Sequence, residues 1–221
     1  IPAVLVIWKG GLVFYGAALG GLLAFVWYTK RHNIRGIEKL RLADILIVGV
    51  PLAHVFGRLG CVSAGCCWGA AAAHLDAAGH LVSSLPFGLR FPEQALAYQS
   101  MIGTVSPDVA AWMQANHSTL PLIPVQLMES FGEGCVFLIL LFVRSRKWFH
   151  GQVLLTYGIL YPILRSTMEM MRGDTERGYV IDCVLSTSQF ISLLVAAASL
   201  VTIYLLRRRG MASIATPSTP A

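Results

Sequence analysis

The sequence has few charged residues for its length. Asp, Glu, Lys and Arg make up 13% of the 221 residues, whereas about 25% is usual for a soluble domain. Hydrophobic residues reach 56%. The scarcity of charge excludes an ordinary soluble surface, and the abundance of apolar residues excludes intrinsic disorder. The composition therefore predicts an all-α fold, namely a polytopic integral membrane protein built of helices.

The start of the chain also lacks three features: an initiator methionine, a basic leader and a small-residue cleavage site. We therefore expect the numbered chain to begin inside a longer gene product. Five apolar runs are the expected spans, over residues 10–29, about 42–60, about 124–143, about 152–171 and about 183–206. The run at 42–60 is the shortest, and Gly49 and Pro51 interrupt it.

Most of the 17 Lys and Arg residues flank these runs. They lie between the first and second runs, between the third and fourth, and after the fifth, and the positive-inside rule assigns these places to the cytoplasm. Basic residues scattered in this way argue against a nucleic-acid binder. We expect a transmembrane domain over residues 1–206, a small extracytoplasmic subdomain inserted at about 61–123 and a disordered cytoplasmic tail at 207–221. Short helices are expected at about 92–102 and 107–116.

A few ionisable residues fall within the apolar runs, where each costs about 2.5–3.5 kcal/mol to insert. Arg165, Glu169 and Arg172 share one helical face, because they follow one another at four and three residues. Further polar and glycine residues near the outer ends of spans are His54, Gly57, Arg58, Gly60, Glu129 and Glu133. One interpretation is a self-neutralising ladder that reaches the outer interface. The other is a cavity that binds an anion such as a lipid phosphate, which glycines would let approach closely.

Four motifs, in order along the chain, resemble those of the bacterial prolipoprotein diacylglyceryl transferases. They are GLVFYGAALGG at 11–21, HVFGRLGCVSAGCCWG at 54–69, PVQLMES at 124–130 and YGILYPILRSTMEMMRGD at 157–174. The resemblance implies transfer of the diacylglyceryl group of phosphatidylglycerol to the lipobox cysteine thiol of a preprolipoprotein, in the bacterial cytoplasmic (inner) membrane. It implies no metal and no organic cofactor.

The resemblance also assigns roles to residues. Arg58 and Arg165 match the family's essential arginines, which would hold the phosphate. Glu169 and Arg172 match the next charged pair, which would line the cavity and orient Arg165. Tyr15 stands where many members have the histidine proposed as base. His54, Gly57, Gly60 and Glu129 are expected to line the substrate site.

The motif at 54–69 departs from the family pattern, because Cys61 replaces an Asn and Cys66 replaces a Glu. The Gly-Cys-Cys-Trp-Gly form resembles a divergent subgroup. For Cys61, Cys66 and Cys67 the open alternatives are a disulfide, which Cys183 could share, free packing thiols and a reactive thiol. The spacing lacks paired C-x-x-C units and so predicts no zinc site. The departures leave a second function open, a non-catalytic lipid-binding subunit of a larger membrane complex, with a transporter or channel as a weaker third.

Overall fold

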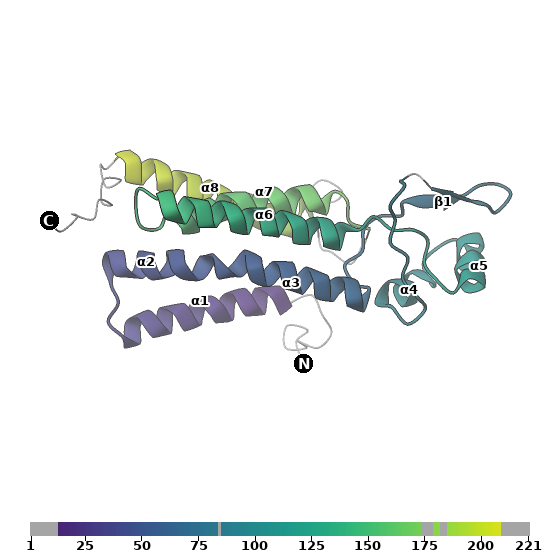
Figure 1. Cartoon of the computed structure of the whole chain (residues 1–221), viewed down its shortest axis with the longest axis horizontal. Coiled ribbons are helices and arrows are strands. Elements are labelled where there is room, and N and C mark those ends of the chain that lie inside the picture. Colours follow the sequence, from purple (N-terminus) through teal and green to yellow (C-terminus); the bar gives the residue numbers. More distant parts are fainter. Residues whose placement is uncertain (1–12, 84, 174–178, 182–184, 209–221) are drawn as a thin grey trace. The chain divides into compact units, whose positions relative to one another are not determined.

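The structure is a computed structural model that describes residues 13–83, 85–173, 179–181 and 185–208. Most of these residues are helical, which confirms the expected fold class (Figure 1). The helices are α1 (Val13–Arg31), α2 (Gly36–Ile47), α3 (Gly49–Ala64), α4 (Leu96–Met101), α5 (Pro107–Asn116), α6 (Val125–Arg146), α7 (Gln152–Glu169) and α8 (Thr187–Arg208). The strands β1 (Ala73–Leu75) and β2 (Leu81–Ser83) form one antiparallel hairpin, and β3 (Tyr179–Ile181) and β4 (Leu185–Ser186) form another.

The chain divides into two compact units, residues 1–43 and residues 44–221. The first unit holds α1 and the first part of α2. These helices are joined by a short turn in which Asn33 and Gly36 both have a φ of 54°. The Nζ of Lys39 lies 5.8 Å from the centre of the Phe25 ring, so the two helices contact each other within this unit.

In the second unit, α3 packs on α6, α6 on α7, and α7 on α8. Val48, Val136, Leu140 and Val153 form the buried apolar centre of this bundle. Gly132 makes the crossing of α6 and α7 close, because a Cβ built there would lie 2.5 Å from the Leu164 side chain. Small residues at such crossings are usual between membrane helices, whose association depends on close packing.

Three stretches of the described chain are long and apolar enough to cross a membrane, namely Gly36–Ala64, Val125–Arg146 and Gln189–Leu206. The sequence predicted five, and the two others, α1 and α7, stay predicted spans. α7 carries Arg165 and Glu169 among its apolar residues. The run at about 42–60, the shortest in the sequence, is part of Gly36–Ala64, the longest of the three stretches. Pro51 does not break this stretch, because it lies in the first turn of α3, where its missing N–H costs little.

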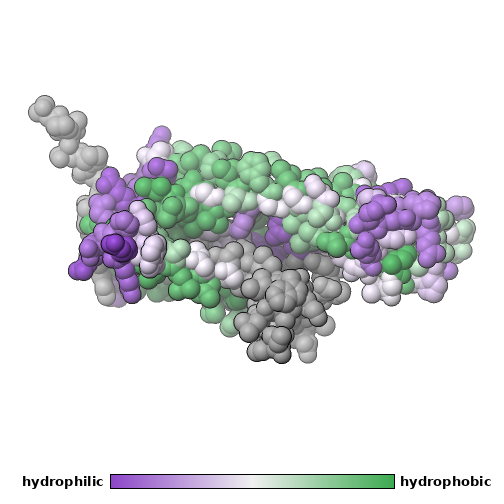
Figure 2. Space-filling view, turned by 90° about the horizontal axis from the view of Figure 1, so that it is seen from below, coloured by the Kyte–Doolittle hydropathy of each residue, from purple (hydrophilic) through white to green (hydrophobic). Residues whose placement is uncertain are grey.

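The helices also expose large apolar side chains, whose contact with water would be unfavourable. On α6, Phe131 is 76% and Leu138 63% exposed, which is typical of a lipid-facing surface. Figure 2 shows apolar residues over the helices and hydrophilic ones at both ends of the view, one of which is formed by the segment between α3 and α6.

That segment, residues 65–124, has more regular structure than the sequence indicated. The helix expected at about 92–102 is shorter, since α4 covers only Leu96–Met101, while α5 has the expected bounds. The β1–β2 hairpin was not expected. Asp76 forms its turn by accepting hydrogen bonds from the backbone N–H groups of Ala78 and His80. Phe91, Ala97 and Leu122 make a small apolar core of its own.

Candidate functional site

The charged residues of the apolar runs meet between α3, α6 and α7. On α6 the buried face includes Gln126, Glu129 and Glu133 among apolar residues. These residues recur every three or four positions, so they point the same way from the helix. α3 contributes His54 and Arg58 to the same place, and α7 contributes Arg165 and Glu169.

Glu129 is the centre of this cluster. Its Oε2 lies 2.8 Å from the Nε of Arg58, and its Oε1 lies 3.6 Å from an Nη1 of both Arg165 and Arg172. The Glu129 side chain is only 5% exposed and that of Arg172 only 2%. One buried carboxylate thus draws three guanidinium groups together.

Glu169 supplies the second carboxylate, which forms an ion pair with Arg165 one helical turn earlier. Three guanidinium groups therefore lie among the buried carboxylates of Glu129 and Glu169, and Glu133 lines the same cavity as Arg58 and Arg165. Such an arrangement can attract an anion, and arginine's planar fork suits a phosphate. Ion pairs within α7 alone would form the self-neutralising ladder considered above. Because Arg58 on α3 and Glu129 on α6 also take part, the charged groups form a cluster between three helices.

A second polar pair lies next to the arginines. The Nδ1 of His54 is 3.1 Å from the Oε1 of Glu133. The Tyr161 ring lies 5.6 Å from the His54 ring, centre to centre, and stacks on Tyr157. Glu133 and Tyr161 line, together with Arg58, Glu129 and Arg165, a cavity of about 10 Å³, which is room for roughly one water molecule. The Oε2 of Glu133 is buried and has no hydrogen-bond partner among the described residues.

The loop after α3 brings cysteines to the edge of this cluster. Cys61, Cys66 and Cys67 are all free in the structure, so no disulfide joins them. A hydrogen bond from Cys61 and the guanidinium of Arg172 lower the pKa of the Cys67 thiol to about 4, against the opposite effect of burial. Burial raises the pKa of Cys66.

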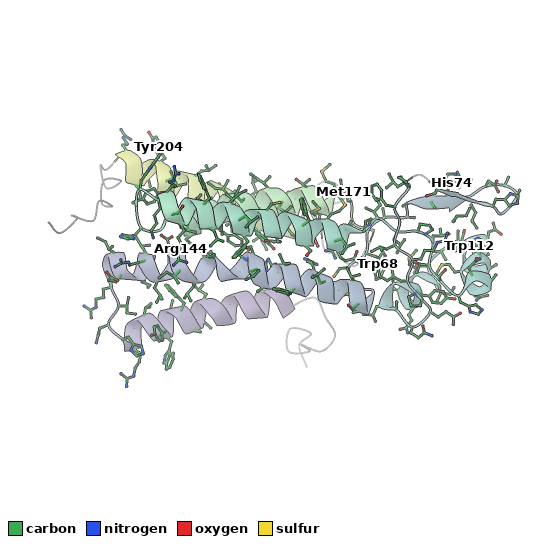
Figure 3. All side chains as sticks on the ribbon, viewed as in Figure 1. Trp68, His74, Trp112, Arg144, Met171 and Tyr204 are labelled. Carbon is green, nitrogen blue, oxygen red and sulfur yellow. The ribbon has the colours of Figure 1, made fainter. Side chains whose placement is uncertain are left out.

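Backbone contacts fix this loop beside the end of α7. The N–H of Ala70 donates to the carbonyl of Met171, and that of Gly173 donates to the carbonyl of Trp68. Trp68 and Met171 lie close together at this end of the bundle (Figure 3). A Cβ at Gly69 would lie 2.5 Å from the carbonyl oxygen of Ile123, so only glycine fits there.

The remaining expected residues are Tyr15, Cys183, Gly57 and Gly60. Tyr15 is on α1, in the first unit, and its side chain is outside the described residues, as is Cys183. A Cβ at Gly57 or Gly60 would meet no atom within 4 Å, so neither glycine makes a close approach to the part of the chain that the structure describes. Tyr161 was not expected at this site. It belongs to the four-residue series Tyr157, Tyr161, Arg165 and Glu169, which could have revealed it.

Fold and site together define a helical membrane protein with an arginine-rich cluster buried among its helices. Comparison with known proteins then gives the family. The family model described as prolipoprotein diacylglyceryl transferase matches residues 2–205, and the chain belongs to this family. The resemblance found in the motifs is thereby confirmed.

Curated relatives carry the same name. The chain is 33% identical over 185 residues to phosphatidylglycerol–prolipoprotein diacylglyceryl transferase 2 of Clostridium perfringens, a match that covers 84% of this chain and 58% of the relative. It is 32% identical over 192 residues to the transferase of Clostridium tetani, covering 87% and 63%. The enzyme of Xylella fastidiosa is 30% identical over 198 residues, covering 85% and 60%. The chain thus spans about three fifths of the length of these relatives. No solved structure matches it.

Proposed function

We propose that this protein transfers the diacylglyceryl group of phosphatidylglycerol to the lipobox cysteine of a preprolipoprotein. The observation that carries the proposal is the set of three arginines around the buried Glu129. The names of the relatives support it and favour an enzyme over a non-catalytic subunit.

The chemistry needs a stabilised leaving group and a deprotonated thiol. The acceptor thiolate attacks the glyceryl carbon that carries the phosphate; a C–S bond forms and the C–O bond to phosphate breaks. Glycerol phosphate leaves with the electron pair of that bond. We assign Arg58 and Arg165 to this phosphate, because fixed guanidinium groups in a dry site stabilise developing negative charge strongly. Their shared partner Glu129 would hold them in place before the lipid arrives.

The remaining roles are proposed from the same arrangement. Glu169 and Arg172 orient Arg165 and line the site, and His54 belongs to the neighbouring pair with Glu133. Gly57 and Gly60 leave open space on α3 for the lipid. Tyr15 occupies the family position of the base that takes the proton of the thiol.

We place the protein in the bacterial inner membrane with the C-terminus in the cytoplasm. Basic residues end α1 and α6, at Lys30, Arg31, Arg144 and Arg146, as expected of cytoplasmic ends. Residues 61–123 are then an extracytoplasmic subdomain and residues 207–221 a cytoplasmic tail. The lipobox of an exported protein would reach the site from the subdomain side, and further subunits of a membrane complex would be additional partners.

The test is transfer by the purified chain in vesicles that contain phosphatidylglycerol, with a lipobox peptide as acceptor. Arg58→Ala and Arg165→Ala should each lower the rate about 10²–10³-fold, the usual effect of removing a group that stabilises a charged transition state. Arg146→Ala is the matched control, because Arg146 lies at the other end of α6 over Phe142. Bound lipid without turnover in the unmodified chain would favour the non-catalytic alternative, and full activity in Arg58→Ala would exclude the assigned role.

A further inference from the structure

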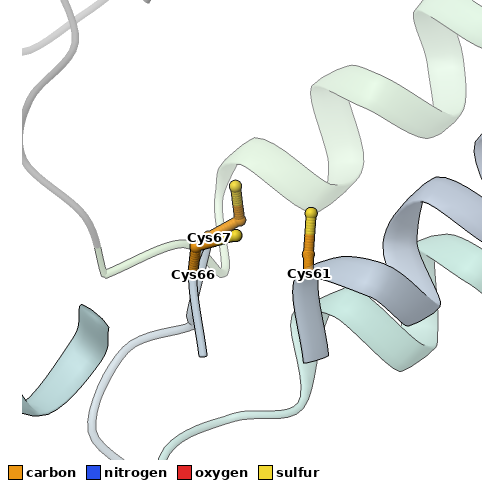
Figure 4. A group of neighbouring side chains, drawn as sticks. All are labelled: Cys61, Cys66 and Cys67. Carbon is orange, nitrogen blue, oxygen red and sulfur yellow. The ribbon is translucent and has the colours of Figure 1, made fainter. Parts of the chain in front are cut away.

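Three cysteines that are not evenly spaced in the sequence converge in space. Cys61 lies in the last turn of α3, and Cys66 and Cys67 lie in the loop after it. The Sγ atoms of all three lie within 4.8 Å of one another. Figure 4 shows their sulfur atoms facing the same space beside the end of α3. The spacing of the cysteines along the sequence predicted no zinc site, but the fold brings the three thiols close enough to share one metal ion.

The backbone explains the convergence. Gly65 ends α3 in the left-handed conformation, with φ 63°, and the N–H of Cys66 donates back to the carbonyl of Cys61. Cys67 also has a positive φ, 57°, which is uncommon for a residue with a side chain and marks local strain. Gln126, which is buried on α6, donates its Nε2 to the carbonyl of Cys66 at 2.8 Å. The three thiols are therefore placed by the fold before any ligand binds.

The charges nearby suit a thiolate cluster. The backbone of Arg172 pairs with that of Gly69, two residues after Cys67, and the Arg172 guanidinium is buried. Arg172 and Arg58 both act on Cys67 electrostatically. A divalent cation with three thiolates carries one net negative charge, which an arginine can balance. Hydrogen bonds to ligand atoms from a surrounding shell are a regular feature of metal sites in proteins.

We propose that Cys61, Cys66 and Cys67 bind a thiophilic divalent cation, Zn²⁺ being the representative case, and that its fourth position takes the acceptor thiol. This inference rests on the proposed function for its last clause only. A Zn–S bond of about 2.3 Å places tetrahedral sulfurs about 3.8 Å apart, and the spread of up to 4.8 Å seen here needs only small side-chain rotations. Three protein ligands with one open position are typical of catalytic rather than structural zinc.

The open position has a use in this reaction. A thiol that coordinates zinc would lose its proton more readily, the base proposed above would take that proton, and the thiolate is the nucleophile that the transfer needs. The metal keeps its oxidation state throughout. Two of the three ligands, Cys61 and Cys66, are the residues that depart from the family motif, so both departures would serve one purpose.

The test of the metal uses the full chain, purified in detergent with a reductant and freed of metal by a chelator. Titration with Co²⁺ should give a thiolate-to-cobalt charge-transfer band that saturates at one ion per chain and disappears when Zn²⁺ is added. Cys61→Ser, Cys66→Ser and Cys67→Ser should each weaken binding by at least about tenfold, as loss of a ligand does. Cys135→Ser, on α6 outside the group, is the matched control and should bind unchanged.

Absence of the band in the unmodified chain would overturn the proposal, and so would an equal loss in Cys135→Ser. The unmodified chain decides the question even where a serine variant fails to fold. A lipobox peptide with cysteine should then shift the cobalt spectrum, and the same peptide with serine should not. An unshifted spectrum would refute the role of the fourth position. Failure of the proposed transfer activity would leave cobalt binding intact, so the two failures are distinguishable.

Discussion

At the scale of single residues, Glu129 determines how the arginines are arranged. Without it, three guanidinium groups would repel one another in a buried place. A buried charge whose partner is removed typically costs about 3–5 kcal/mol, because the remaining charge keeps its desolvation penalty. Glu129 therefore both stabilises the bundle and preserves the positions from which Arg58 and Arg165 can meet a phosphate.

Glu129→Gln tests this double role. We expect the free energy of unfolding to fall by about 3 kcal/mol and transfer to fall with it, because the arginines lose their common acceptor. Thermal unfolding in detergent measures the first effect and the vesicle assay the second. Glu93→Gln is the control, since Glu93 pairs with the exposed His117 in the outer segment. Equal stability of Glu129→Gln and the unmodified chain would contradict the central position assigned to Glu129.

The sequence predicts some of these residues well for a simple reason. Arg58, Arg165 and Glu169 stand out because charge is rare in apolar runs, and a membrane protein rarely keeps such residues without a use. The pairing of Glu129 with arginines from two other helices depends on which helices are neighbours, which periodicity does not specify. The convergence of the cysteines depends on two left-handed residues, Gly65 and Cys67, and local conformation of this kind is not visible in spacing.

At the scale of elements, α7 depends on a residue far away in sequence. Asp44, on α2 and fully buried, accepts hydrogen bonds from the backbone N–H groups of Gly151 and Leu154 at 2.9 and 3.1 Å. Its Oδ2 also lies 2.9 Å from the Nζ of Lys147. The carboxylate thus satisfies free donors at the start of α7 and favours the positive end of the helix dipole. It anchors the helix that carries Arg165.

Asp44→Asn should therefore lower the free energy of unfolding by about 3 kcal/mol, because Lys147 loses its charged partner in a buried place. The measurement is thermal unfolding in detergent. Glu38→Gln is the control; Glu38 forms an exposed ion pair with Arg41, and such pairs contribute about 0–1 kcal/mol. A shift of the same size in both variants would mean that the Asp44 contacts do not anchor α7.

Some helices and strands are predicted correctly from the sequence, and others are not. The start of α5 follows from Pro107, which suits the first position of a helix, and here the prediction agrees with the structure. The β1–β2 hairpin was missed because its strands have three residues each and its register depends on Asp76, which reads as an ordinary loop residue. The anchoring by Asp44 was missed as well, since no local pattern links it to residues more than a hundred positions later.

At the scale of the whole molecule, the scarcity of charge led directly to the membrane class, and the helices confirm it. The number of spans is less well determined by composition. α7 is a predicted span whose ionisable residues lower its hydropathy, so the same residues that indicate function obscure the topology. The proposed orientation depends on every run crossing once, which makes it testable as a single property of the chain.

Reporter insertions test this orientation. Alkaline phosphatase, which is active only outside the cytoplasm, should be active when inserted at Gly79, in the exposed turn between β1 and β2. The same reporter should be inactive between Arg146 and Gly151, the α6–α7 connection, and a fluorescent protein fused after Ala221 should fluoresce. The reason is that basic residues near the ends of spans resist export. Activity at the α6–α7 connection would invert the topology. The three cysteines and the arginines around Glu129 would then lie on the side of the membrane from which no exported lipobox could reach them.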